Sequence, residues 1–211
     1  MTARTYFFVR HAEALHQTQP APPAGEVPGA EWPLTERGER QARELARWAR
    51  AARVERLVSS SLLRARQTAA IVASAAAVPA TDAWPELDEI APRVLRIDPR
   101  ERERPEWLEG IAGAWRVRRH AREGGGTPAI LEIEARVREV LARLDALPER
   151  RIAVVGHGYW ILLMALIVPG RFRLRLMTNC SVTRVQTDGP GAHRLVDFAR
   201  PASAAHRPRG A

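Results

Sequence analysis

The sequence predicts an α/β fold with a mainly parallel central sheet. Short apolar segments such as "YFFV" (6–9) and "RIAVVG" (151–156) have the length of buried strands, and longer segments with apolar residues at helical spacing separate them. Strands that alternate with helices form βαβ units, in which the strands run parallel. The chain has 211 residues, of which 45% are hydrophobic, enough for one core. We therefore expect one domain over residues 1–200 and a disordered tail over 201–211.

The N-terminal half contains two predicted strands and two predicted helices. A strand at 6–9 is followed by a Pro- and Gly-rich segment (16–33) without periodicity, which indicates a long loop. Thr35 is a suitable N-cap for a helix, because Leu45, Trp48, Ala49 and Ala52 follow at helical spacing. The segment "RLVSSS" (56–61) predicts a second strand, and "LLRARQTAAIVASAAA" (62–77) predicts a helix that ends before Pro79.

The C-terminal half is predicted with one gap. Residues 80–104, rich in Pro and charge, give no clear pattern. A helix is expected over 132–147, a strand over 151–158, and then an apolar helix that Pro169 and Gly170 terminate. Two late strands (181–187 and 193–199) flank "DGPG", which is typical of a hairpin turn.

Composition restricts the possible functions. The net charge is +9, and all 33 basic residues are arginine. An arginine-only pattern in an Ala-, Pro- and Gly-rich chain indicates codon bias, so charge alone gives no argument for nucleic-acid binding; it does favour anionic ligands. The single cysteine excludes an internal disulfide and a cysteine metal cluster. The apolar run "WILLMALIV" (160–168) is too short for a membrane span, and we expect a cytoplasmic protein.

Polar residues follow three of the predicted strands. Arg10 and His11 end the first strand, "SSSLLR" follows the second, and His157 ends the "IAVVGH" strand. Ligands bind at the carboxyl ends of parallel strands, so these three clusters are expected to meet in one crevice. There, Arg10 and Arg64 would bind phosphate oxygens, and one neutral histidine could attack phosphorus while the other donates hydrogen bonds. A proton donor for the leaving group is expected in "WPELDEI" (84–90).

Four motifs occur in order along the chain: "VRHAE", "PLTERGERQA", "SSSLLRARQTA" and "VVGHG". Together they resemble the motifs of the histidine phosphatase superfamily, the phosphoglycerate mutase-like proteins, and "NCSVTRV" resembles the last core strand of that family. The resemblance extends from residue 6 to about residue 187. It implies a three-layer α/β/α sandwich, no cofactor and no metal.

The resemblance also implies roles for individual residues. His11 would be phosphorylated, Arg10, Arg64 and His157 would complete the phosphate pocket, and Glu89 would be the general acid, with Glu86 as its rival. Gln17 stands where many members carry Asn and is a candidate substrate contact. The two arginines beside His11 are expected to lower its pKa, which keeps the imidazole neutral for attack.

The function we expect is hydrolysis of phosphomonoesters without a metal, through a phosphohistidine on His11. The partner would be a small phosphorylated substrate rather than a nucleic acid or a membrane. Phosphoglycerate mutase-type transfer is one alternative, against which Ala14 counts because mutases prefer Ser or Thr there. A non-catalytic phosphate-binding regulatory module is the other. Residues 91–126 and the 16–33 loop would shape substrate choice, and the substrate itself stays open.

Overall fold

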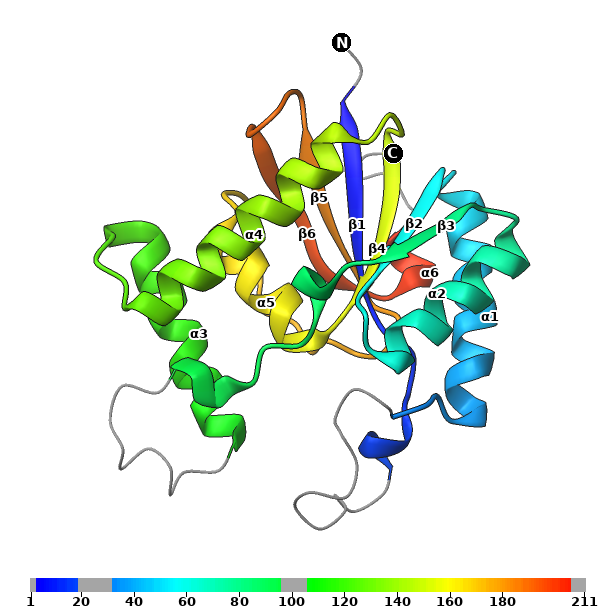
Figure 1. Ribbon diagram of the computed structural model, residues 1–211, viewed down its shortest axis with the longest axis horizontal. Helices are drawn as coiled ribbons and strands as arrows, with labels where there is room; N and C mark the ends of the chain where they lie inside the picture. Colours follow the sequence, from blue (N-terminus) through cyan, green and yellow to red (C-terminus); the bar gives the residue numbers. More distant parts are fainter. Residues whose placement is uncertain (1–2, 19–31, 96–105, 206–211) are drawn as a thin grey trace.

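Six strands form one sheet in the order β3–β2–β4–β1–β5–β6 in the computed structural model, which describes residues 3–18, 32–95 and 106–205 (Figure 1). The strands are β1 (Arg4–Arg10), β2 (Arg56–Ser59), β3 (Ala80–Ala83), β4 (Arg151–Gly156), β5 (Val182–Thr187) and β6 (His193–Arg200). The pairs β3–β2, β2–β4 and β4–β1 are parallel, whereas the pairs β1–β5 and β5–β6 are antiparallel. The sheet is therefore mixed, and its parallel half contains the strands that carry the predicted site.

Helices cover both faces of the sheet, which gives the three layers that the family resemblance implies (Figure 1). The helices are α1 (Glu36–Ala51), α2 (Leu63–Ala76), α3 (Glu106–Glu123), α4 (Pro128–Ala146), α5 (Gly158–Ile167) and α6 (Ala202–Ala205). Figure 1 shows α1 and α2 on one side of the sheet and α3, α4 and α5 on the other.

Alternation along β1 divides the core between these two sides. Phe7 and Val9 pack with α1 and α2, whereas Tyr6 and Phe8 pack with α4 and α5. Successive side chains of a strand point to opposite faces, so a strand buried on both faces becomes an uninterrupted apolar run. This accounts for "YFFV", in which all four residues are buried.

Local sequence sets the helix ends. The Thr35 hydroxyl oxygen accepts a hydrogen bond from the Gly38 N–H at 2.9 Å, as an N-cap does. Helix α2 ends at Ala77, which has left-handed backbone angles (φ 54°). Helix α5 is apolar on nearly all sides because it packs between the sheet and its neighbouring helices.

Several elements escaped the sequence prediction. Residues 80–95, which show no clear pattern in the sequence, contain β3 and two 3₁₀ turns, η2 (Pro85–Leu87) and η3 (Pro92–Leu95). Helix α3, which begins at Glu106, was not predicted either. The tail expected to be disordered from residue 201 begins with one helical turn, α6, which packs beside α1; residues 206–211 lie outside the described residues. Within the part of the chain that the structure describes, no helix has both the length and the apolarity needed to cross a membrane.

Candidate active site

The carboxyl ends of β1, β2 and β4 bring the predicted site residues together. The His11 N–H donates to the Gly156 carbonyl oxygen at 2.9 Å, and the Ser60 N–H donates to Val155 at 2.9 Å. His157 follows β4 directly and caps α5. The rings of His11 and His157 lie 5.2 Å apart between centroids. Residues from positions 10, 11, 60–64 and 157 thus come together at the carboxyl ends of the strands, as the strand-end rule predicts.

The hydrogen bonds of His11 fix its tautomer. Its Nδ1 lies 2.7 Å from the Ala12 carbonyl oxygen, and a carbonyl only accepts, so Nδ1 carries the proton. Its Nε2 accepts from the Arg64 Nε–H at 3.2 Å. Nε2 is therefore the nitrogen with a lone pair available to an electrophile. Burial lowers the pKa of His11 well below its usual value, and Arg64 and Arg10 lower it further, as expected, although burial is the larger cause.

Arg10 and Arg64 supply the positive charge around His11. Arg10 donates to the Met177 carbonyl oxygen through Nη1, and its buried Nε has no hydrogen-bond partner among the described residues. Arg64 comes from the first turn of α2 and is 7% exposed. A guanidinium stays charged at any working pH, so this pair can neutralise an anion.

A chain of hydrogen bonds holds His157. The Ser60 hydroxyl donates to Asp88 Oδ1 at 2.6 Å and lies 2.7 Å from His157 Nε2. A hydroxyl can donate only one hydrogen bond, and Ser60 donates it to the Asp88 carboxylate. Ser60 must therefore accept a hydrogen bond from the Nε2–H of His157. His157 Nδ1, which is buried and has no partner among the described residues, then bears a lone pair. Burial is also the main reason that the pKa of His157 is lowered well below its usual value.

The two glutamates of "ELDE" occupy different environments. The Glu89 carboxylate accepts from the Trp160 N–H at 3.0 Å and the Tyr159 N–H at 3.4 Å, at the start of α5. Burial raises its pKa even though these backbone donors act in the opposite direction. Glu86 forms an ion pair with Arg143 at 2.8 Å instead. Glu89 is thus held at the start of α5 with a raised pKa, whereas Glu86 is paired with an arginine of α4.

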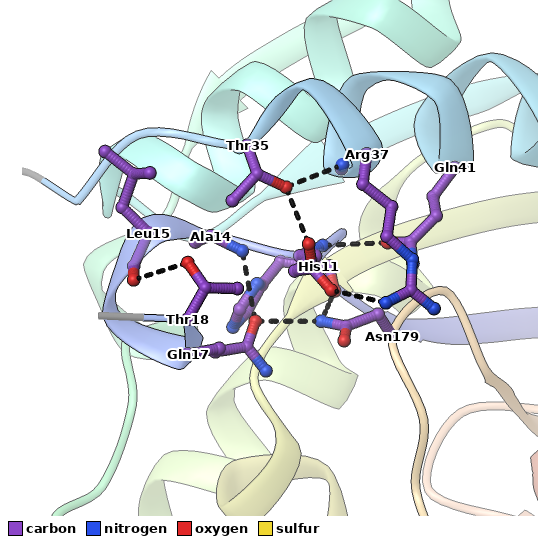
Figure 2. Close-up of polar contacts among 11 residues, drawn as sticks. His11, Ala14, Leu15, Gln17, Thr18, Thr35, Arg37, Gln41 and Asn179 are labelled. Atoms are coloured by element: carbon purple, nitrogen blue, oxygen red, sulfur yellow. Dashed lines mark hydrogen bonds and ion pairs between the residues drawn. The ribbon is translucent and has the colours of Figure 1, made fainter. Parts of the chain in front are cut away.

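Gln17 lies at the rim and contacts other side chains of the rim. Its Oε1 accepts from the Ala14 N–H at 3.1 Å and from Asn179 Nδ2 at 3.0 Å, and Asn179 also donates to the His11 carbonyl oxygen at 3.0 Å (Figure 2). His16 stands nearby, with its ring centroid 5.9 Å from that of His11. Burial, Arg64 and Arg10 lower the pKa of His16 to about 4, so its ring is neutral near pH 7.

The second motif, "PLTERGERQA", contacts the loop that follows β1 (residues 11–14) through Glu13. The Glu13 carboxylate accepts from the Thr35 hydroxyl at 2.8 Å and from Arg37 at 3.1 Å, and Gln41 Oε1 accepts from the Glu13 N–H at 2.9 Å. Figure 2 shows Thr35, Arg37 and Gln41 converging on the loop from α1. A Cβ on Gly38 would lie 2.0 Å from the Glu13 carbonyl oxygen, so only glycine permits this approach.

Several positioning residues were not predicted as such. Ser60 and Asp88 lie inside quoted motifs, and Asn179 lies in "NCSVTRV", but no periodicity links them to His157 or His11. Arg136, from α4, donates to the carbonyl oxygens of Glu86 and Asp88 and so holds the segment that carries Glu89. Such a contact, 48 residues away along the chain, leaves no local signal.

The fold and this site define a class, the α/β proteins in which two histidines and two arginines come together beside the carboxyl ends of the strands, a set of groups suited to binding an anion. More specifically, the chain belongs to the histidine phosphatase superfamily (branch 1), whose family profile matches residues 6–198.

Relatives within the family carry different names. The probable phosphoglycerate mutase GpmB of Yersinia enterocolitica is 32% identical over 191 residues, covering 85% of this chain and 83% of that protein. A mycobacterial glucosyl-3-phosphoglycerate phosphatase superposes with a TM-score of 0.61 at 21% identity, covering 94% of this chain and all of the other. The protein histidine phosphatase SixA, complexed with tungstate, gives a TM-score of 0.58 at 19% identity, covering 94% of this chain and 97% of that chain. At these identities, the two solved structures support the fold alone.

Proposed function

We propose that this protein is a metal-independent phosphatase that hydrolyses phosphomonoesters through a phosphohistidine on His11. One observation carries the proposal. The hydrogen bond from His11 Nδ1 to the Ala12 carbonyl oxygen leaves the Nε2 lone pair beside the Arg64 guanidinium, where a phosphoryl group would be held. A neutral imidazole and two fixed cations meet the main demands of phosphoryl transfer, which are positioning and charge neutralisation.

In the first half-reaction, His11 Nε2 forms a bond to phosphorus while the bond from phosphorus to the ester oxygen breaks. Glu89, in the protonated form that burial favours by raising its pKa, transfers its proton to the departing alkoxide. Arg10, Arg64 and His157 bind the equatorial oxygens, which carry the charge.

In the second half-reaction, water attacks the phosphohistidine. The Glu89 carboxylate accepts a proton from the attacking water, the bond between Nε2 and phosphorus breaks, and inorganic phosphate leaves. His11 recovers its lone pair and Glu89 its proton, so the cycle closes without a further reactant.

Mutase activity is the second candidate, because the Yersinia enterocolitica relative named above is called a probable phosphoglycerate mutase. A mutase returns the phosphoryl group to substrate and keeps water away from the phosphohistidine. Incubation with 3-phosphoglycerate separates the two: a phosphatase releases inorganic phosphate, whereas a mutase produces 2-phosphoglycerate with little release.

The proposal is tested by hydrolysis of p-nitrophenyl phosphate in EDTA. Wild type is expected to keep its turnover, and His11→Ala to lose roughly 10³-fold or more, the scale on which removal of a catalytic nucleophile acts. His120→Ala is the matched control, because His120 pairs with Glu134 at 2.9 Å on helices α3 and α4. It should remain within twofold of wild type.

Glu89→Gln is compared with Glu86→Gln in the same assay. General acid catalysis contributes about 10²–10⁴-fold, so Glu89→Gln should lose that much with an alkyl phosphate. The first-turnover burst of p-nitrophenolate, which departs without a proton, should be slowed much less, whereas the later steady rate should fall because Glu89 also accepts the proton of the attacking water. Glu86→Gln should lose little with either ester. Phosphate binding without turnover of any ester by wild type would contradict the phosphatase and leave the regulatory module.

A further inference from the structure

A groove of about 780 Å³ runs between α3 and α5, outside the phosphate pocket. Its walls include Pro92, Ile111, Trp115, Tyr159 and Leu174. Pockets of this size hold ligands as large as drugs or cofactors. Figure 1 shows the two helices that form its sides, α3 in green and α5 in yellow.

The groove exposes large apolar side chains that a folded protein would ordinarily cover. Ile111 is 49% exposed, Trp115 67% and Leu174 79%. These are three of the six large hydrophobic residues exposed in the described part of the chain, and all three border the same groove. A concentration of exposed apolar surface in one concave site indicates an apolar ligand.

The lining offers few polar groups to a ligand. Its polar side chains are Tyr159, whose hydroxyl already donates to the Gly110 carbonyl oxygen at 3.1 Å, and Arg118, which lies over the Phe172 ring at 5.5 Å. A sugar would lose its hydrogen bonds to water here and find few replacements. A hydrocarbon chain or aromatic ring would lose none.

Three segments connect the groove to the catalytic residues. The Tyr159 ring lines the groove while its N–H donates to the Glu89 carboxylate at 3.4 Å. Pro92 lies three residues after Glu89. Leu174 lies three residues before Met177, and the Met177 carbonyl oxygen accepts a hydrogen bond from Arg10. Three residues span at most about 10 Å, so the groove begins on the side where Glu89 would protonate a leaving group.

We propose that this groove binds the alcohol part of the substrate, and that the substrate is a phosphomonoester of an apolar alcohol. The statement that the substrate is hydrolysed rests on the proposed phosphatase function. The statement that the groove binds an apolar group does not. Phosphate is held by the arginines and histidines at the strand ends, and the apolar group extends past Glu89 into the groove between α3 and α5.

Alkylphosphonates test the binding without any chemistry, because their carbon–phosphorus bond is not hydrolysed by a phosphatase. Affinity is measured by calorimetry for a series from methyl- to octylphosphonate. Each buried methylene should tighten binding roughly fourfold. Octylphosphonate should therefore bind at least about 100-fold tighter than methylphosphonate even if only half of its additional methylenes are buried.

Ala114→Phe fills the groove, because Ala114 belongs to its lining and is partly buried. This variant should flatten the dependence on chain length. The matched control is Ala121→Phe, which adds the same side chain at an exposed position of α3 outside the groove and should keep the full dependence. The wild-type series decides the question even if Ala114→Phe fails to fold.

Equal affinities along the wild-type series would overturn the inference. So would a dimer in sedimentation that dissociates on Ala114→Phe while the affinities stay equal, since a second copy of the chain would then occupy the groove. Failure of the phosphatase function is recognised separately, as absent turnover of p-nitrophenyl phosphate. A rise in phosphonate affinity with chain length would support the apolar groove in either case.

Discussion

At the scale of single residues, the proton on His157 determines what its ring can offer to an anion. The Ser60 hydroxyl donates a hydrogen bond to Asp88 and accepts one from the Nε2–H of His157, so the neutral ring presents a lone pair at Nδ1. A phosphate dianion needs a donor there. The ring must therefore gain a proton at Nδ1 when a dianion binds, and Asp88 stabilises the resulting imidazolium through Ser60.

This reasoning predicts the protonation of His157. In the free protein at pH 7 its imidazole should be neutral with the proton on Nε2, because burial lowers its pKa and its neighbours His11, Arg64, His16 and Arg10 act in the same direction. Added sulfate, a dianion throughout the working range, should produce the doubly protonated ring, seen as a change in the ¹⁵N shift of Nδ1.

Ser60→Ala tests the connection to Asp88. Loss of a hydrogen bond to a charged group costs about 1.5–3 kcal/mol, so sulfate should bind roughly 10- to 100-fold more weakly, and His157 should stay largely neutral at saturation. A ring with its proton on Nδ1 in the free wild-type protein would contradict this assignment.

At the scale of elements, α1 packs closely against the loop that follows β1 (residues 11–14). Gly38 stands in the first turn of α1, and a Cβ there would overlap the Glu13 carbonyl oxygen. The helix and the loop cannot separate without breaking the bonds of Glu13 to Thr35 and Gln41.

Gly38→Ala should therefore destabilise the fold by about 1–3 kcal/mol, the usual effect of overpacking, although alanine favours helix. It should also lower activity, because the loop that shifts carries His11. Urea denaturation measures the first effect and p-nitrophenyl phosphate turnover the second. Gly189→Ala is the control: a Cβ at that turn between β5 and β6 meets nothing within 4 Å. Equal free energies of unfolding for Gly38→Ala and Gly189→Ala would contradict the close contact between Gly38 and Glu13.

The elements also show where sequence reasoning reached its limit. The strands and helices that carry site motifs were predicted because their apolar periodicity and caps are local, as at Thr35 and in "YFFV". Strand β3 escaped because four residues on a sheet edge give too short a pattern. Helix α3 escaped because it mixes arginines with exposed Ile111 and Trp115, so no clear apolar face marks it.

At the scale of the whole molecule, three neutral histidines at one end of the sheet make stability depend on pH. Burial lowers the pKa of His11, His16 and His157, and Arg64 and Arg10 add to the effect. Below pH about 6.5 the unfolded chain binds protons at these positions while the folded protein does not. The folded state should therefore lose stability as pH falls from about 6.5, continuing toward the folded pKa of His16, about 4.

Urea denaturation at pH 7 and pH 5 measures this loss. His11→Ala should reduce the difference between the two pH values, because one of the three titrating groups is gone. Equal or greater stability of wild type at pH 5 would show that the pocket accepts protons as readily as the unfolded chain does.

How much of the site could be predicted also differs by scale. Arg10, His11, Arg64 and His157 follow from strand ends and motif order, and the structure brings them together. The distinction between Glu89 and Glu86 required geometry, because both lie in one charged stretch and only Arg143 and the start of α5 separate their environments. The apolar groove joins positions from 92 to 174, so no single segment contains its pattern.

The residues just after the loop that follows β1 are bonded to the residues just before α1. The Leu15 N–H donates to the Pro33 carbonyl oxygen at 3.0 Å, Ala14 and Leu34 form an antiparallel bridge, and the Leu34 N–H donates to Gln67 at 2.8 Å. These bonds fix Ala14 and Leu15 beside Pro33 and Leu34 at the entrance to α1, and Gln67 joins the same point to α2. Three segments far apart in the sequence are thereby fastened together three to four residues after His11, so a substitution at Gln67 would loosen the backbone near His11 without touching its ring.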